Sequence, residues 1–184
     1  GGPAQQLRLP EIDKTLCPDD AINIQFTSGT TGMPKGATLS HYNIVNNARY
    51  VTDRINLTEA DRLAIPVPLY HCFGMVMGVL GAVSKGAAMV FPGEAFEASQ
   101  TLDCLVTERC TALYGVPTMF IAMLEKLEAE SGGKWRLAKV NVDENQELAA
   151  HFGVRSIPHV VAFADGQAVD QFIGVLPESQ LREF

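Results

Sequence analysis

Residues 27–36 have the sequence Thr27-Ser28-Gly29-Thr30-Thr31-Gly32-Met33-Pro34-Lys35-Gly36, and they carry the strongest chemical signal in the chain. The three glycines allow a tight turn that points backbone N–H groups into a concavity. The hydroxyl groups add donors, and Lys35 adds a positive charge. Such a loop suits a polyphosphate, as a helix N-terminus does. It lacks the G-x-x-x-x-G-K-[ST] spacing of a Walker loop, and a flexible surface turn is the alternative interpretation.

Strand and helix patterns alternate on both sides of this loop. A strand over residues 22–27 leads into it, and a helix with one apolar face is predicted from His41. Further strands are predicted at 63–67, 88–91, 111–116, 137–142, 159–163 and 169–173, and helices at 75–83, 96–109, 117–130, 144–152 and from 177 onward. This order predicts an α/β fold, namely a three-layer α/β/α sandwich with a mostly parallel sheet and an antiparallel hairpin near the C-terminus.

The loop resembles the ATP-phosphate signature of the adenylate-forming superfamily, which includes the fatty acyl-CoA synthetases. Three later segments extend the resemblance, which covers roughly residues 17–128: residues 36–43 (GATLSHYN), 68–74 (PLYHCFG) and 114–120 (YGVPTMF). The resemblance implies that His71 lies beside an acyl pocket, and a hydrogen-bonded histidine at a strand end is the alternative. It also implies a vestigial nucleotide-phosphate loop made of Thr27, Ser28, Gly29, Thr30, Thr31, Gly32, Lys35 and Gly36.

Later motifs of that superfamily are missing from this sequence. They are the tyrosine-glycine-x-threonine-glutamate segment for adenine and metal, the aspartate for ribose, and the C-terminal lysine that steers adenylation. Attack on the α-phosphate depends on positioning and charge neutralisation together. We therefore expect no catalytic residue, no enzyme activity, no metal site and no required cofactor. Weak binding of ATP with Mg²⁺ is the most that we expect from the loop.

From Lys134 onward the sequence resembles the second half of a thioredoxin-like domain. The resemblance rests on residues 137–145 (LAKVNVDEN), 152–158 (FGVRSIP), Asp165-Gly166 and 177–184 (PESQLREF). It implies a cis peptide bond before Pro158. The chain has no tryptophan-cysteine-x-x-cysteine motif, so dithiol exchange is excluded and Pro158 is expected to be a structural proline.

These resemblances predict three segments. Residues 1–16 form an extended lead-in that starts with Gly1-Gly2, a cloning remnant. Residues 17–130 are an acyl-CoA-synthetase-like fragment, and residues 131–184 are a thioredoxin-like half merged with it into one folded unit. The junction is placed within residues 124–131, inside a helix that both parents could share. Because a strand has only two edges, either the two strand sets merge into a single sheet or one set pairs elsewhere.

Charge and cysteine content limit the partners of the chain. The net charge is −7 and the pI is about 5.0, without a basic cluster, so nucleic acid and anionic membranes are excluded as partners. The longest apolar run, residues 72–83, is too short to span a bilayer. The four cysteines show no C-x-x-C spacing, and we find no signal peptide, so reduced thiols in the cytoplasm are expected.

The leading functional hypothesis is an engineered or recombined chimeric protein without intact parental catalysis. One alternative is a weak ATP or polyphosphate binder that acts through residues 27–36. Another is an acyl-CoA ligase fragment that needs a partner chain. A further alternative is an interaction module, because truncation would uncover apolar faces that favour a homo-oligomer.

Overall fold

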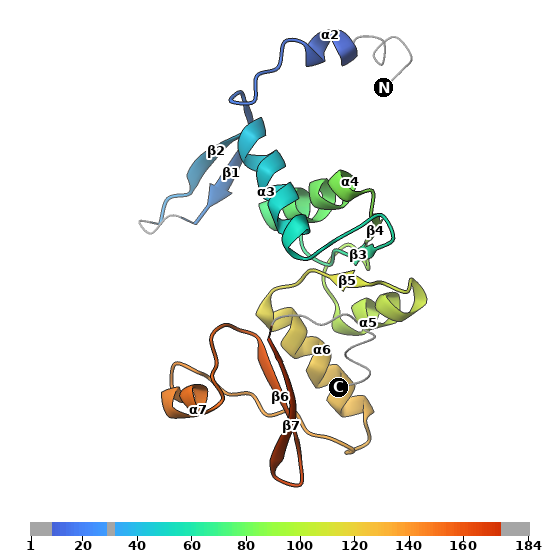
Figure 1. Cartoon of the computed structure of the whole chain (residues 1–184), viewed down its shortest axis with the longest axis vertical. Helices are drawn as coiled ribbons and strands as arrows, with labels where there is room; N and C mark the ends of the chain where they lie inside the picture. Colours follow the sequence, from blue (N-terminus) through green and yellow to red (C-terminus); the bar gives the residue numbers. More distant parts are fainter. Residues whose placement is uncertain (1–8, 29–31, 174–184) are drawn as a thin grey trace. The chain divides into compact units, whose positions relative to one another are not determined.

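The computed structural model describes residues 9–28 and 32–173, and its strands form one parallel sheet and two antiparallel hairpins (Figure 1). The chain divides into two compact units. The first contains residues 1–57 and 69–85, and the second contains residues 58–68 and 86–184. The predicted α/β class, with its parallel sheet and C-terminal antiparallel hairpin, is confirmed.

The first unit is built on an antiparallel hairpin of β1 (Ala21–Thr27) and β2 (Lys35–Ser40). Helix α3 (His41–Arg54) follows β2 without a linker, because Ser40 both ends the strand and caps the helix. The Ser40 side chain accepts a hydrogen bond from the Asn43 amide at 3.3 Å, and the Asn43 side chain accepts one from the Ser40 amide at 3.0 Å. This reciprocal capping box fixes where the strand turns into the helix.

The lead-in differs from the extended chain that we expected. Residues 9–13 form a short helix, α2 (Leu9–Asp13). Pro10 stands in its first turn, where the missing N–H costs nothing, and Glu11 in that turn complements the helix dipole. The part of the lead-in before Leu9 lies outside the described residues.

The core of the first unit lies between α3 and a helix that is wider than predicted. The predicted helix at 75–83 is present as a π-helix, η1 (Phe73–Leu80), continued by α4 (Gly81–Lys85). Val76 of η1 packs against Ile44 and Ala48 of α3. A Cβ atom at Gly81 would lie 2.9 Å from Thr52 Cγ2, so only glycine allows this close approach of the helices. The apolar periodicity indicated a helix, but it could not distinguish α from π geometry.

The second unit contains the parallel sheet, in the order β4-β3-β5. Its strands are β3 (Arg62–Ala64), β4 (Ala88–Val90) and β5 (Ala112–Leu113), and its helices are α5 (Ala98–Thr107) and α6 (Pro117–Glu130). The central strand β3 is the best covered, and Leu63 within it is fully buried. Glu97 caps α5 by accepting hydrogen bonds from the Ser99 and Gln100 amides.

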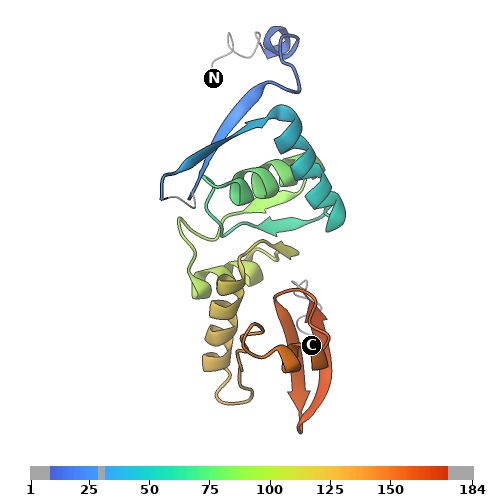
Figure 2. The same ribbon diagram turned by 90° about the vertical axis from the view of Figure 1, so that its left-hand side faces the viewer.

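The C-terminal part of the second unit forms its own hairpin, without the single merged sheet that was one of our alternatives (Figure 2). It contains α7 (Gln146–His151), β6 (His159–Ala164) and β7 (Gln167–Ile173), and among the described residues β6 pairs only with β7. The strand predicted at 137–142 does not form. Both edges of the central strand β3 are occupied, and the two edge strands β4 and β5 are only three and two residues long, so among the described residues the sheet offers only short edges to that segment. The helix predicted from Pro177 lies outside the described residues.

Removal of the Leu63 side chain should destabilise the second unit strongly. Leu63→Ala leaves a cavity in the central strand, for which we expect a loss of about 2–5 kcal/mol in the free energy of unfolding, measured by urea denaturation. Val106→Ala on α5 is the matched control, because Val106 is 57% exposed and its truncation should cost less than about 0.5 kcal/mol. Equal losses in the two variants would contradict the described core.

Asp61 should make the stability of the second unit depend on acid pH. The hydrogen bond from the Thr111 hydroxyl, at 2.8 Å, is the main cause that holds the pKa of Asp61 below its ordinary value of 3.8, and bonds from Thr58 act in the same direction. The contribution is therefore full above pH 3.8 and is lost as the pH falls through the lowered pKa of the folded state. We expect Asp61→Asn to have a lower Tm than the parent chain at pH 7, and this difference in Tm should disappear in acid. Asp143→Asn, on an exposed turn, should have the same dependence of Tm on pH as the parent chain.

Candidate functional site

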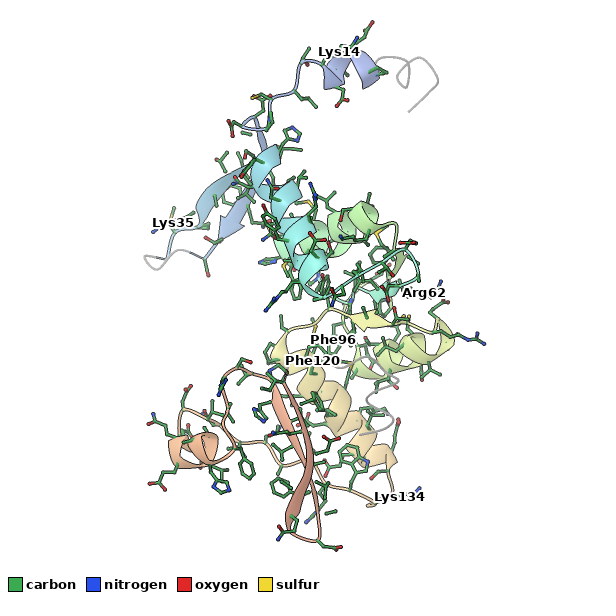
Figure 3. The ribbon with its side chains drawn as sticks, viewed as in Figure 1. Lys14, Lys35, Arg62, Phe96, Phe120 and Lys134 are labelled. Carbon is green, nitrogen blue, oxygen red and sulfur yellow. The ribbon has the colours of Figure 1, made fainter. Side chains whose placement is uncertain are left out.

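The predicted phosphate loop is closed by the end of the β1–β2 hairpin. Thr27 lies opposite Lys35 in the ladder, and its hydroxyl donates a hydrogen bond to the Lys35 carbonyl oxygen at 3.5 Å. The loop therefore begins and ends at neighbouring positions, with Lys35 at the end of the hairpin (Figure 3). This pairing holds the two ends of the loop in a fixed relation.

The individual loop residues are only partly described. Ser28 follows β1, and Gly36 lies in β2 opposite Phe26. Gly32 has φ of +83°, a conformation that favours glycine, with no atom within 4 Å of the position of a Cβ. Gly29, Thr30 and Thr31 lie outside the described residues.

The two faces of the hairpin have different environments. Residues directly opposite each other in a ladder share a face, so Gln25 lies on the same face as Thr27 and Lys35. Leu39 lies on this inner face too, and it packs against the core cluster of the first unit. On the outer face Ile24 and Phe26 are 60% and 66% exposed. Self-association through such an uncovered face stays a prediction.

His71 lies two residues before η1, next to its N-cap residue Cys72, in the same compact unit as the loop. Its Nδ1 atom accepts a hydrogen bond from the Phe73 amide at 3.1 Å, and its carbonyl oxygen accepts one from the Met75 amide at 3.0 Å. The imidazole is exposed. The structure therefore places His71 at the start of a helix with one ring nitrogen already engaged.

Gln25 connects the segment around His71 to the strand that leads into the loop. Its Nε2 donates a hydrogen bond to the Tyr70 carbonyl oxygen at 3.4 Å, and its Oε1 accepts one from the Cys72 thiol at 3.1 Å. Gln25 was not predicted from the sequence, because a lone glutamine in a short strand has the pattern of a solvated residue. The available signal was its position, two residues before Thr27 on the same face of the strand.

Pro158 lies in the second unit. The Ile157–Pro158 peptide bond is cis, the geometry that the resemblance led us to expect. Its structural role stays a prediction.

Lys35 forms no ion pair with another described residue. The ion pairs between described residues join Arg62 to Glu108, Lys85 to Asp53, Lys126 to Glu130 and Lys139 to Glu125.

Within residues 9–28 and 32–173, no group of three or more His, Cys, Asp or Glu side chains could hold a metal ion. In the same part of the chain no helix combines the length and the apolar character needed to cross a membrane.

The family match and the most similar known sequences agree with each other. The family described as AMP-binding enzyme matches residues 2–165. The acyl-CoA ligase sidI of Beauveria bassiana is 48% identical over 118 residues, which are 64% of this chain and 20% of the relative. The mitochondrial medium-chain acyl-CoA ligase ACSF2 of Danio rerio is 50% identical over 119 residues, again 64% of this chain and 20% of the relative. The chain thus spans about a fifth of the length of these curated relatives.

Solved structures agree with the sequence relatives. ATP-bound MatB from Rhodopseudomonas palustris has a TM-score of 0.57 and 32% identity, and the match covers 73% of this chain and 28% of that one. The o-succinylbenzoate coenzyme A synthetase MenE from Bacillus subtilis, in complex with ATP and magnesium ion, has a TM-score of 0.56 and 30% identity over 60% of this chain and 23% of that one.

One expectation from the sequence is wrong. We expected a chain outside any enzyme class, but the matching family is a family of enzymes and the curated relatives are named as ligases. The missing later motifs led to that error, because they say what this segment lacks and not which class it comes from. The chain belongs to the AMP-binding enzyme family.

Proposed function

We propose that this chain is the segment of an acyl-CoA ligase that holds the phosphates of ATP, and that it acts together with the remaining parts of such an enzyme. The observation that carries the proposal is the closed hairpin, which sets Thr27 beside Lys35. Gln25 lies on the same face of the hairpin, and its hydrogen bonds hold the segment of His71. In this proposal the loop of residues 27–36 receives the phosphates, and His71 lies toward the acyl substrate.

The chemistry of the loop suits the reaction of the relatives. Forming an acyl adenylate requires a carboxylate to attack the α-phosphate while pyrophosphate leaves, so negative charge must be neutralised around the phosphates. Lys35, without an ion-pair partner among the described residues, can supply a charge-assisted hydrogen bond to a phosphate oxygen. Mg²⁺ would arrive with ATP and would help to neutralise the charge of its phosphates.

The groups that this sequence lacks define the role of the rest of the enzyme. Because the chain spans about a fifth of its curated relatives, we propose that the adenine-binding segment, the ribose-binding aspartate and the steering lysine come from the remainder. This proposal of a ligase fragment replaces the expectation that the chain belongs to no enzyme class.

Loss of the Lys35 charge should weaken nucleotide binding. For Lys35→Ala we expect roughly 10- to 100-fold weaker binding of ATP–Mg²⁺ than for the unmodified chain, measured by isothermal titration calorimetry, because a charged hydrogen bond is lost. Lys14→Ala is the matched control, since Lys14 is also an exposed lysine of the first unit but lies away from the hairpin (Figure 3). Identical affinities for both variants and the parent chain would overturn the phosphate site.

A graft should show whether the segment works inside a complete ligase. We propose replacing the 118-residue matching segment of the Beauveria bassiana ligase with the corresponding part of this chain. The hybrid should retain ATP–pyrophosphate exchange with the substrate of that ligase, and Lys35→Ala in the hybrid should reduce the exchange about 100-fold or more. A folded hybrid without exchange would contradict the proposal.

We also propose that residues 131–184 are the second half of a thioredoxin-like domain joined to the ligase segment by recombination and folded as one unit with it. The succession of α7, the β6–β7 hairpin and its turn at Asp165-Gly166 supports this. The family match, which runs to residue 165, speaks for an origin of part of this segment within the ligase family.

Trp135, the single tryptophan, allows the one-unit proposal to be tested. It lies within residues 131–184, whereas Leu63 lies in the parallel sheet. If the two parts unfold together, Leu63→Ala should shift the thermal transition of Trp135 fluorescence as far as that of far-UV circular dichroism. An unchanged fluorescence transition would show that the C-terminal segment unfolds independently.

A further inference from the structure

Residues 65–71, which end with His71, form neither a helix nor a strand. An exposed side chain on such a segment has a defined direction only if the backbone on both sides is held. In the first unit the Met75 amide holds the His71 carbonyl oxygen, and the carboxamide of Gln25 adds contacts to the residue before His71 and the residue after it.

We propose that Gln25 is a positioning residue for His71. Its N–H group donates to the Tyr70 carbonyl and its oxygen accepts from the Cys72 thiol, so a single planar group holds both neighbours of His71 against β1. A glutamine is suited to this task because its side chain offers a donor and an acceptor side by side. The inference rests on the proposed function for one point only, namely that His71 faces the acyl substrate.

A hydrogen bond from the Phe73 amide determines which nitrogen of the imidazole carries the proton. The Phe73 amide donates to Nδ1, which must therefore offer a lone pair, and in the neutral ring the proton is on Nε2. With the backbone held by Gln25, His71 presents an Nε2–H group as a donor. That donor suits a carboxylate or carbonyl oxygen of an acyl substrate.

The position of Gln25 joins this restraint to the phosphate loop. Gln25 lies two residues before Thr27, and both face the same side of the hairpin, so the loop end and the His71 segment are held by one strand. Gln25 thereby fixes the distance between the group that would face the acyl substrate and the loop that would face ATP.

The test uses the full chain with Gln25→Leu, which removes both hydrogen bonds at similar volume. We expect the Nε2–H tautomer fraction of His71, measured by long-range ¹H–¹⁵N NMR at a pH where the ring is neutral, to fall toward that of a free imidazole. We also expect Cys72 to be alkylated roughly fivefold faster, followed by mass spectrometry, because a hydrogen bond that holds its segment is lost. Gln25→Glu keeps the oxygen acceptor for Cys72 and loses the donor to Tyr70. The alkylation rate of Cys72 in this variant should therefore lie between the rates in the parent chain and in Gln25→Leu.

Asn23→Leu is the matched control. Asn23 is a half-buried amide on the same face of the same strand, two residues away, and it contacts neither Tyr70 nor Cys72 by any hydrogen bond within the described residues. It should leave the His71 tautomer and the Cys72 rate unchanged. If Gln25→Leu behaves like Asn23→Leu, the proposal is overturned, and if Gln25→Leu does not fold, the same comparison is decided with Gln25→Glu.

A parallel titration with ATP–Mg²⁺ separates this proposal from the proposed function. Gln25→Leu should bind ATP within about twofold of the parent chain, because it leaves Lys35 and the loop unchanged. If the parent chain itself does not bind ATP, the phosphate site fails, while the tautomer and alkylation measurements still decide the role of Gln25.

Discussion

The pairing of β1 with β2 is the constraint on which the rest of the first unit depends. A seven-residue loop rich in glycine and hydroxyl groups has many conformations, and its ordering is costly unless its ends are fixed. The ladder brings Thr27 and Lys35 together, and it also determines which side chains share a face. The inner face carries the polar contacts and Leu39 reaches the core, while Ile24 and Phe26 remain uncovered on the other side. The site is thus a property of strand register, and a slip by one residue would exchange the two faces.

The second unit depends on the burial of a short central strand in a sheet of short strands. β3 has three residues, yet it is flanked on both edges and contains the fully buried Leu63. Polar contacts at its start join it to its neighbours, since Thr111 donates to Asp61 and Arg62 forms an ion pair with Glu108. A charged pair of this exposure adds little by itself, so the packing of apolar side chains accounts for most of the stability of this sheet.

Much of this architecture could be predicted from local patterns, and the failures are instructive. The helix at 117–130 was predicted with both of its ends, because Pro117 marks the start and Ser131-Gly132-Gly133 marks the end. Strand β2 was missed because residues 35–40, KGATLS, are small and polar, and their pairing depends on β1 more than on their own pattern. The opposite error occurred at 137–142, where a good strand pattern meets only the short outer edges of β4 and β5 and does not pair. The loop and His71 were found by motif, whereas Gln25 was not, because hydrogen bonds across 45 and 47 residues leave no trace in the sequence around it.

The junction at Ser40 has a mechanical consequence. Because the same residue ends β2 and caps α3, no flexible link absorbs a rotation of the hairpin, and the helix must turn with it. Over the 14 residues of α3, a tilt at the cap becomes a displacement at the far end, about 21 Å away. There Thr52 lies against Gly81 without spare room. The hairpin and its helix therefore form a lever, through which a disturbance at the loop can be transmitted to the opposite end of the unit.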